Sequence, residues 1–262
     1  MMALGLTLYP VISNYVNQKY ASEIFTAYQE VIAQTDNTVL LQERGKAIAY
    51  NQTLIPRTGS DGSYTQEALQ SASGEYNSML NLAGDGIMGY IEIPKINVHL
   101  PIYHGTEDTV LQVAVGHVEG SSLPVGGAGT HCVLSGHRGL PSATLFTDLD
   151  QLQEGDTFQL HVLDEVLTYE VDQINVVEPD DVSLLAISEE EDLCTLVTCT
   201  PYGVNSHRLL VRGHRVETEQ EEAAVRLVSD GIQIEPLLVA PVVALPMLLA
   251  LLLVLLLSGN KR

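Results

Sequence analysis

The chain has 262 residues, of which 12 are Lys or Arg and 33 are Asp or Glu, so its formal net charge is −21. Such a chain lacks the basic surface that holds nucleic-acid phosphates, which excludes nucleic-acid binding as its function. Its hydrophobic fraction of 45% is sufficient for a folded core, whereas its charged fraction of 17% lies below the roughly 25% typical of soluble domains. Part of the chain is therefore expected to avoid water.

The chain begins with an apolar segment, residues 1–16, which ends before the polar residues Asn17, Gln18 and Lys19. The segment is shorter than the about 20 residues that a membrane-spanning helix needs, and it has no basic start. Two interpretations are open. It is either the distal part of a signal anchor or an amphipathic helix that rests on the membrane or on the folded domain.

Residues 17–50 are expected to be helical, with one helix from about residue 20 and a second, shorter one near residues 43–50. The apolar residues at helical spacing in the first helix are Ile24, Tyr28, Val31 and Ile32. The next segment, residues 51–74, is rich in Gly, Ser, Thr and Asn. This composition predicts a long surface loop, and loops of that length are usually either functional or disordered.

From Gly86 onward the hydrophobic period changes to two residues, which is typical of strands. Because these strands follow one another without long helical crossovers, the sequence favours an antiparallel sandwich or a closed barrel over a doubly wound sheet. The β domain is expected to cover residues 75–217, with a hairpin around Asp164 and Glu165. The expected strands are 87–94, 98–103, 132–135, 157–163, 166–176, 195–199 and 208–215.

An acidic linker, residues 218–235, leads to residues 236–257, which contain no charged residue. This run is long enough to cross a hydrocarbon core of about 30 Å as a helix, so it predicts a transmembrane helix. Lys261 and Arg262 in the tail, residues 258–262, favour the cytoplasmic side. The chain is therefore expected at the cell membrane, with its bulk outside the cell.

Cys199 ends an apolar strand and is followed at once by a turn sequence, which places its thiol at the mouth of the fold. A single cysteine is more often a small buried hydrophobe than a nucleophile, so its role depends on its neighbours. Cys132 and Cys194 are expected in the core. The acidic residues 189–192 are expected to raise the pKa of Cys194 rather than activate it.

Two further residues have the chemistry that a cysteine nucleophile needs. His137 follows a short strand and is framed by glycines, which allows other groups to approach the imidazole. Arg208 lies on the strand after Cys199 and nearer to the turn than Arg212, so Arg208 is the better candidate to lie level with the thiol. The alternative is that the arginines only form a solvated strand edge.

The sequence TLVTC, with an arginine on the next strand and a histidine after an upstream strand, resembles the sortases, a family of Gram-positive surface transpeptidases. Three longer segments are similar to the class C, pilin-polymerising sortases, and residues 5–20 and the C-terminal anchor also resemble that class. These segments are GYIEIPKINVHLPIYHGT (89–106), GTHCVLSGHRGLPSATLFTDLDQL (129–152) and TLVTCTPYGVNSHRLLVRGHR (195–215). The resemblance implies a mostly β fold, a closed eight-stranded barrel with short helices, an N-terminal helical extension and a C-terminal transmembrane helix.

The resemblance also implies the chemistry. Cys199 would attack the Thr–Gly carbonyl of an LPXTG-type sorting signal and form a thioacyl enzyme. His137 would act as general acid and base, and Arg208 would donate hydrogen bonds to the substrate carbonyl or the oxyanion. No metal or cofactor is implied. The partners would be pilins or surface proteins with sorting signals, with a pilin lysine as the acyl acceptor, and a lipid membrane.

Class C sortases usually have a lid loop with an Asp-Pro-aromatic motif over the cleft, and residues 51–74 contain no such triplet. The nearest equivalent is Asp61 with Tyr64, which would approach the arginine and cover the cysteine, and a plain loop is the alternative. Two other functions stay open. One is a housekeeping sortase that anchors proteins to peptidoglycan, and the other is a membrane-tethered binding module with an inactive triad.

Overall fold

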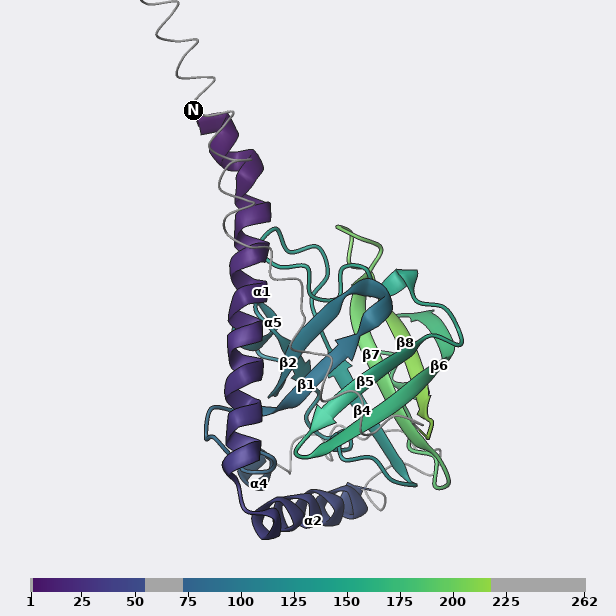
Figure 1. The fold of residues 1–262 in the computed structure, drawn as a ribbon. Helices are drawn as coiled ribbons and strands as arrows, with labels where there is room; N and C mark the ends of the chain where they lie inside the picture. The colour runs from purple at the N-terminus through teal and green to yellow at the C-terminus, as the bar shows by residue number, and fades with distance from the viewer. Residues whose placement is uncertain (1, 55–72, 218–262) are drawn as a thin grey trace, which may run out of the picture. The chain divides into compact units, whose positions relative to one another are not determined.

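The computed structural model describes residues 2–54 and 73–217, and its centre is a closed β-barrel (Figure 1). Around the barrel the strand order is β1-β2-β3-β4-β7-β8-β6-β5. The predicted closed eight-stranded barrel is therefore confirmed. The strands are β1 (Ile87–Ile93), β2 (Val98–His104), β3 (Val115–His117), β4 (Thr130–Ser135), β5 (Thr157–Val162), β6 (Glu165–Val177), β7 (Asp192–Thr200) and β8 (His207–Arg215).

Most neighbouring strands pair antiparallel, and the predicted hairpin is the β5–β6 pair, which closes at Val162 opposite Glu165. Two pairs differ from the antiparallel expectation, because β2–β3 and β4–β7 are parallel. The β5–β6 hairpin lies between β4 and β7 in the chain, so that β7 returns beside β4 in the same direction. β3 was missed because three residues are too few to show an alternating pattern.

Alternate residues of the strands fill the barrel. Leu134 of β4, Leu196 of β7 and Val211 of β8 belong to one core cluster. Cys132 and Cys194 belong to it too and lie opposite each other in the β4–β7 ladder, as expected for core cysteines. Burial is the first cause that raises the pKa of the Cys194 thiol, and Asp192 adds a smaller effect in the same direction. Both thiols are buried in the core.

The helical extension consists of α1 (Met2–Gln34) and α2 (Asn37–Leu54). α1 is one continuous helix that runs through the predicted division after residue 16. α2 starts before and ends after the predicted second helix, and it includes the first residues of the predicted loop 51–74. The short helices among the described residues are α4 (Ser73–Tyr76), α5 (Asp108–Leu111), η2 (Pro94–Ile96), η3 (Leu149–Gln151) and η4 (Ser183–Leu185).

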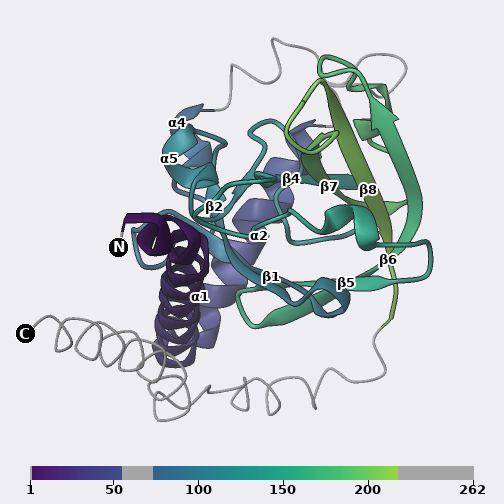
Figure 2. The same cartoon turned by 90° about the horizontal axis from the view of Figure 1, so that it is seen from above.

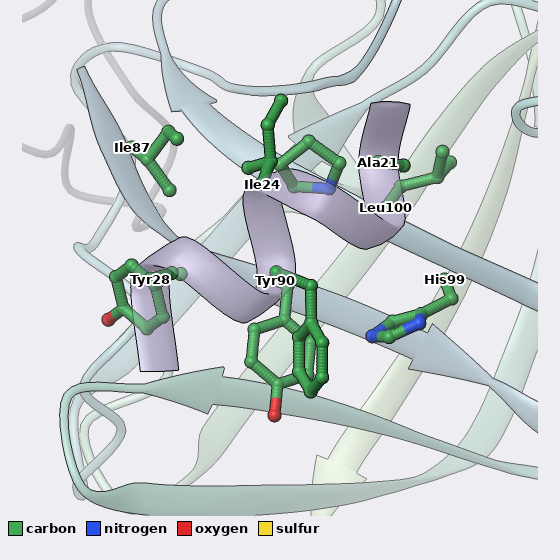
Figure 3. A pocket seen from close by; sticks show the side chains of 10 residues that line it. Ala21, Ile24, Tyr28, Ile87, Tyr90, His99 and Leu100 are labelled. Atoms are coloured by element: carbon green, nitrogen blue, oxygen red, sulfur yellow. The ribbon is translucent and has the colours of Figure 1, made fainter. Parts of the chain in front are cut away.

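α1 runs along the side of the barrel beside β1 and β2, as two views at right angles show (Figures 1 and 2). A small pocket lies in this interface, where Tyr28 of α1 and Tyr90 of β1 line it (Figure 3). The buried Tyr28 hydroxyl donates to the Met88 carbonyl at 3.1 Å and accepts from the Leu163 amide at 2.8 Å. The Phe25 ring packs edge-on against the Tyr90 ring, with the two ring centroids 4.4 Å apart. These contacts fix α1 to β1 and to the β5–β6 turn.

α2 lies across one end of the barrel (Figure 1). The Asn51 side chain donates to the Leu123 carbonyl at 3.1 Å and accepts from the Leu123 amide at 2.7 Å. Arg44 forms an ion pair with Glu165 at the start of β6. The predicted apolar face of the first helix is present as well, because Ile24 and Ile32 pack against the cluster that contains Tyr28.

Within residues 2–54 and 73–217, no helix has both the length and the apolar character needed to cross a membrane. The predicted transmembrane helix, residues 236–257, lies outside the described residues, as do the linker 218–235 and the tail 258–262.

Candidate active site

Cys199 and Arg208 face each other across two hydrogen-bonded strands. The antiparallel ladder of β7 and β8 pairs Cys199 directly with Arg208, whereas Arg212 is paired with Thr195 further along. Side chains directly opposite in such a ladder have Cβ atoms about 4.5–5.5 Å apart. The Cys199 side chain is half-buried, while Cys132 and Cys194 are fully buried. Of the three thiols, Cys199 is therefore the one that a substrate can approach.

His137 lies on the other side of Cys199, after the end of β4. The parallel β4–β7 ladder ends with Ser135 paired to Val197, and His137 and Cys199 each lie two residues beyond this last pair. The Gly136 amide continues the contact by donating to the Val197 carbonyl at 3.0 Å. Because β7 lies between β4 and β8, the structure brings Cys199 between His137 and Arg208.

Cys199 and Arg208 lie on the outer face of the barrel. Leu134, Leu196 and Leu209 point into the core cluster, so the alternate positions on their strands point outward. Cys199 and Arg208 take these outward positions, and His137 lies two residues after the outward-facing Ser135 of the neighbouring strand β4. A thiol, an imidazole and a guanidinium on three neighbouring segments are the groups that nucleophilic attack with a general acid–base and an oxyanion-stabilising cation would use.

The guanidinium of Arg208 is oriented by the loop between β7 and β8. Its Nη1 donates to the His207 carbonyl at 3.1 Å and to the Asn205 carbonyl at 3.4 Å. These two backbone carbonyls restrict the orientation of the planar guanidinium on the residue that pairs with Cys199.

Thr198 ties the strand of Cys199 to the segment of His137, and the sequence analysis did not identify it. Its side chain is only 2% exposed, and its hydroxyl donates to the Gly136 carbonyl at 2.8 Å. This bond joins the residue before Cys199 to the residue before His137. The sequence feature that could have indicated its role is a threonine at an inward-facing strand position. Such a hydroxyl needs a hydrogen-bond acceptor when it is buried.

Gly136 has no room for a side chain. A Cβ atom at this position would lie 2.6 Å from Cδ2 of the buried Phe146 ring. Phe146 in turn donates its backbone amide to the His137 carbonyl at 3.0 Å. The absence of a side chain at residue 136 thus allows Phe146 to pack directly under the backbone that carries His137.

Arg138, directly after His137, is the second residue that sequence reasoning missed. Its side chain is only 9% exposed and pairs with Asp150 near η3. Its guanidinium lies 5.8 Å from the centre of the Tyr202 ring, and its Nη1 is 3.5 Å from the Thr200 hydroxyl. Arg138 therefore links the His137 segment to the β7–β8 loop. The sequence feature that could have indicated Arg138 is an arginine beside the candidate histidine, because the chain has only 12 Lys and Arg residues.

The loop between β6 and β7 is fastened to the same outer face through His131. The imidazole contacts the Ala186 carbonyl through Nδ1 at 2.8 Å and the Thr195 hydroxyl through Nε2 at 2.7 Å. Burial, with a smaller contribution from the Arg212 guanidinium, lowers the pKa of His131 to about 4. A neutral ring fits both contacts, because Nδ1–H donates to the carbonyl and Nε2 accepts from the hydroxyl.

The other arginines of this strand have structural partners. Arg212 forms a two-pronged ion pair with Asp172, at 3.0 and 2.9 Å, and Arg215 lies 5.9 Å from the centre of the Tyr169 ring. The lid candidates Asp61 and Tyr64 lie outside the described residues. In the part of the chain that the structure describes, no group of three or more His, Cys, Asp or Glu side chains is placed to hold a metal ion.

Comparison with known proteins gives a consistent result. Residues 91–216 match the model of the sortase domain family. The crystal structure of sortase C1 from Streptococcus agalactiae is 49% identical, with a TM-score of 0.68, over 75% of this chain and 100% of that chain. A sortase C structure from Streptococcus pneumoniae is 45% identical, with a TM-score of 0.66, over 75% of this chain and 97% of that one. The pneumococcal structure is described as giving insights into catalysis and pilin substrate specificity.

A curated relative, sortase D of Bacillus subtilis, is 36% identical over 131 residues, which is 49% of this chain. The chain spans 63% of the length of that relative.

Proposed function

Since the chain belongs to the sortase family, whose members are cysteine transpeptidases, we propose that it cleaves an LPXTG-type sorting signal between Thr and Gly and transfers the new acyl end to an amine. The observation that supports this proposal is the position of Cys199, which pairs with Arg208 in the β7–β8 ladder and lies on the strand next to β4, the strand that leads to His137.

In the acylation step, the Cys199 thiolate attacks the carbonyl carbon of the threonine, because the thiolate and not the thiol is the nucleophile. A C–S bond forms, and the oxyanion of the tetrahedral intermediate accepts hydrogen bonds from Arg208. When the C–N bond to glycine breaks, the leaving amine takes a proton from the His137 imidazolium. The products are a thioacyl enzyme and a released glycine peptide.

In the transfer step, an incoming amine attacks the thioester carbonyl. Neutral His137 takes the proton that the amine loses, and the C–S bond breaks to regenerate the thiolate. The net reaction exchanges one amide for another, so no oxidant, reductant or metal is consumed.

We further propose a lysine amine of a pilin subunit as the acceptor. The support is the likeness to sortase C structures from two streptococci, one of which is described in terms of pilin substrate specificity. Anchoring of surface proteins to peptidoglycan uses the same acylation step and differs only in the acceptor. The proposed place of action is the outer face of the cell membrane, with residues 236–257 as anchor, because this run is apolar and uncharged.

We also propose that the part of residues 51–74 that lies between α2 and α4 provides a lid, with Asp61 directed to Arg208 and Tyr64 over Cys199. The support is charge and ring chemistry: a carboxylate suits the guanidinium, and an aromatic ring shields a thiol from water.

Intact-mass spectrometry of the full chain in detergent, incubated with an LPXTG peptide, tests the acylation step. The expected product is a covalent adduct with the mass of the peptide truncated after Thr. Cys199→Ala should give no adduct, and His137→Gln should form it far more slowly than the control variant His214→Gln, whose ring lies away from Cys199 on β8. An adduct on Cys199→Ala, or an alkylatable Cys199 that never acylates, would overturn the proposal.

The acceptor is tested by adding a lysine-bearing pilin fragment or a peptidoglycan cross-bridge peptide to the preformed adduct. Faster release into an isopeptide-linked product with the pilin fragment supports the class C function, and faster release with the cross-bridge peptide supports the housekeeping alternative. If Cys199 resists both acylation and alkylation, deletion of residues 57–66 should restore both. Failure to do so would contradict the lid.

A further inference from the structure

Two asparagines of the N-terminal helix α1 make hydrogen bonds to the segment that follows His137. The Asn14 Oδ1 atom accepts from the Thr144 amide at 3.0 Å and from the Thr144 hydroxyl at 2.9 Å. The Asn17 Nδ2 atom donates to the Ser142 carbonyl at 2.7 Å. These bonds join parts of the chain that are 125 to 130 residues apart.

The chemistry of the partners determines how both amide groups are oriented. A backbone N–H can only donate, so it must face the oxygen of Asn14. A backbone carbonyl can only accept, so it must face the nitrogen of Asn17. The two side chains are therefore not interchangeable, and each has its own requirement.

The two asparagines extend the face of α1 that packs on the barrel. Asn14 and Asn17 are three residues apart, and the same helical face continues through Ala21 and Tyr28, each 7% exposed. Asparagine is a poor residue for a helix interior unless its side chain has a specific partner, and here both have one. Because Tyr28 fixes α1 to β1 and the β5–β6 turn, the asparagines are held by a rigid element.

We define the His137 loop as residues 137–147. Its two ends are closed near His137, because the Phe146 amide donates to the His137 carbonyl at 3.0 Å and the Gly139 amide donates to the Thr147 hydroxyl at 3.1 Å. Leu140 and Ala143 form a β-bridge across it. Ser142 and Thr144, on either side of Ala143, are the residues that α1 holds.

We propose that Asn14 and Asn17 are positioning residues for His137, so that the N-terminal helix forms part of the active-site scaffold. A loop at the end of a strand opens readily unless its polar backbone groups have partners elsewhere. Here α1 supplies those partners at the far end of the loop, while β4 and Phe146 hold the near end. The inference rests on the proposed transpeptidase function, and it adds an element outside the matched sortase domain, residues 91–216.

The test compares four variants of the full chain in detergent. Asn14→Ala and Asn17→Ala each remove one contact. Asn14→Asp keeps an oxygen acceptor for the Thr144 N–H and is the conservative rescue. Gln18→Ala is the matched control, because Gln18 is an exposed polar residue on the same helix. Three readouts are taken: hydrogen exchange of residues 138–147, the kcat and KM for an LPXTG peptide, and the pH dependence of kcat.

Asn14→Ala and Asn17→Ala should increase amide exchange in the His137 loop and lower kcat by about 3- to 10-fold, with KM within about twofold of wild type, because a displaced general acid affects the chemical step. The limb of the kcat profile that reports His137 should shift in pH. Asn14→Asp and Gln18→Ala should resemble wild type in all three readouts.

Unchanged exchange and kcat in both alanine variants would overturn the inference. A lower kcat with an unchanged pH profile and no rescue by Asn14→Asp would overturn it too, since general destabilisation would then be sufficient. If wild type itself does not acylate, the proposed function fails, and the exchange of residues 138–147 still decides whether α1 holds the loop.

Discussion

Arg208 lies directly opposite Cys199 in the β7–β8 ladder, on the outer face of the barrel. A residue so placed can meet the oxygen of a carbonyl that Cys199 attacks, whereas Arg212, paired with Thr195, lies further along the strand and is held by Asp172. The relationship between the two neighbouring strands therefore distinguishes two arginines that are similar in the sequence.

Substitution of Arg208 by Ala is expected to lower kcat for LPXTG cleavage by about 10²- to 10³-fold, the usual loss when one oxyanion donor is removed. Arg208→Lys should recover only part of this loss, because an ammonium lacks the planar fork of the guanidinium. Arg212→Lys is the control: it should affect thermal unfolding more than kcat, because the two-pronged pair with Asp172 is structural. Equal losses of kcat at both positions would contradict the assignment.

Thr198→Val should lower the free energy of unfolding by about 1–3 kcal/mol, because the buried Gly136 carbonyl loses its hydroxyl partner. The kcat should fall as well, since this bond joins the residues that precede Cys199 and His137. Thr198→Ser should restore both quantities. Thr26→Val, at an exposed helix position, should change neither. Denaturant titration and steady-state kinetics measure the two effects, and a normal kcat in Thr198→Val would count against the coupling.

Gly136→Ala places a methyl group 2.6 Å from the Phe146 ring, so the ring or the backbone of His137 must move. We expect a loss of stability of about 1–3 kcal/mol from overpacking and a lower kcat. Gly45→Ala in α2 is the matched change, because no atom lies within 4 Å of its Cβ. That variant should gain about 0.5–1 kcal/mol of stability, since alanine favours the helix. Thermal unfolding with parallel activity assays tests both expectations.

His131 should make the chain less stable in mild acid. Its folded-state pKa is about 4, below the unfolded value near 6.5. The unfolded state therefore binds the proton first as the pH falls, so stability is complete above about pH 6.5 and declines toward pH 4. Between pH 7.5 and 5 the decline attributable to His131 is about 2 kcal/mol.

His131→Asn, which lacks a titrating group, isolates this contribution when urea unfolding is measured at both pH values. The fall in the free energy of unfolding should be smaller in the variant than in wild type. His99 and His104, whose pKa values burial also lowers, remain in both proteins and cancel in the difference. An identical pH dependence in the two proteins would show that His131 does not titrate as the structure implies.

Local patterns were enough to predict much of the barrel. The two-residue period of β5 and β6 and the turn at Asp164 predict a hairpin. A tight turn between two alternating segments makes them pair with each other, because they are separated by only a few residues. In the same way, the run before Cys199 and the strand that carries Arg208 are near in sequence, and the register of a short hairpin brings them level. The charge balance excluded nucleic acid without any structural knowledge.

Relationships between distant segments were decided only by the tertiary structure. The parallel pairing of β4 with β7 brings the strand that leads to His137 next to the strand that carries Cys199, and no local pattern encodes which strands become neighbours across an intervening hairpin. The roles of Thr198 and Arg138 depend on that pairing, since their partners come from other segments. The contact of Asn14 and Asn17 with residues 142–144 is the most distant case. The sequence determined the strands and the chemical groups, because side-chain alternation and turn chemistry are local. The packing of α1, β4, β7 and β8 determined the site, because it brings together residues that are far apart in the chain.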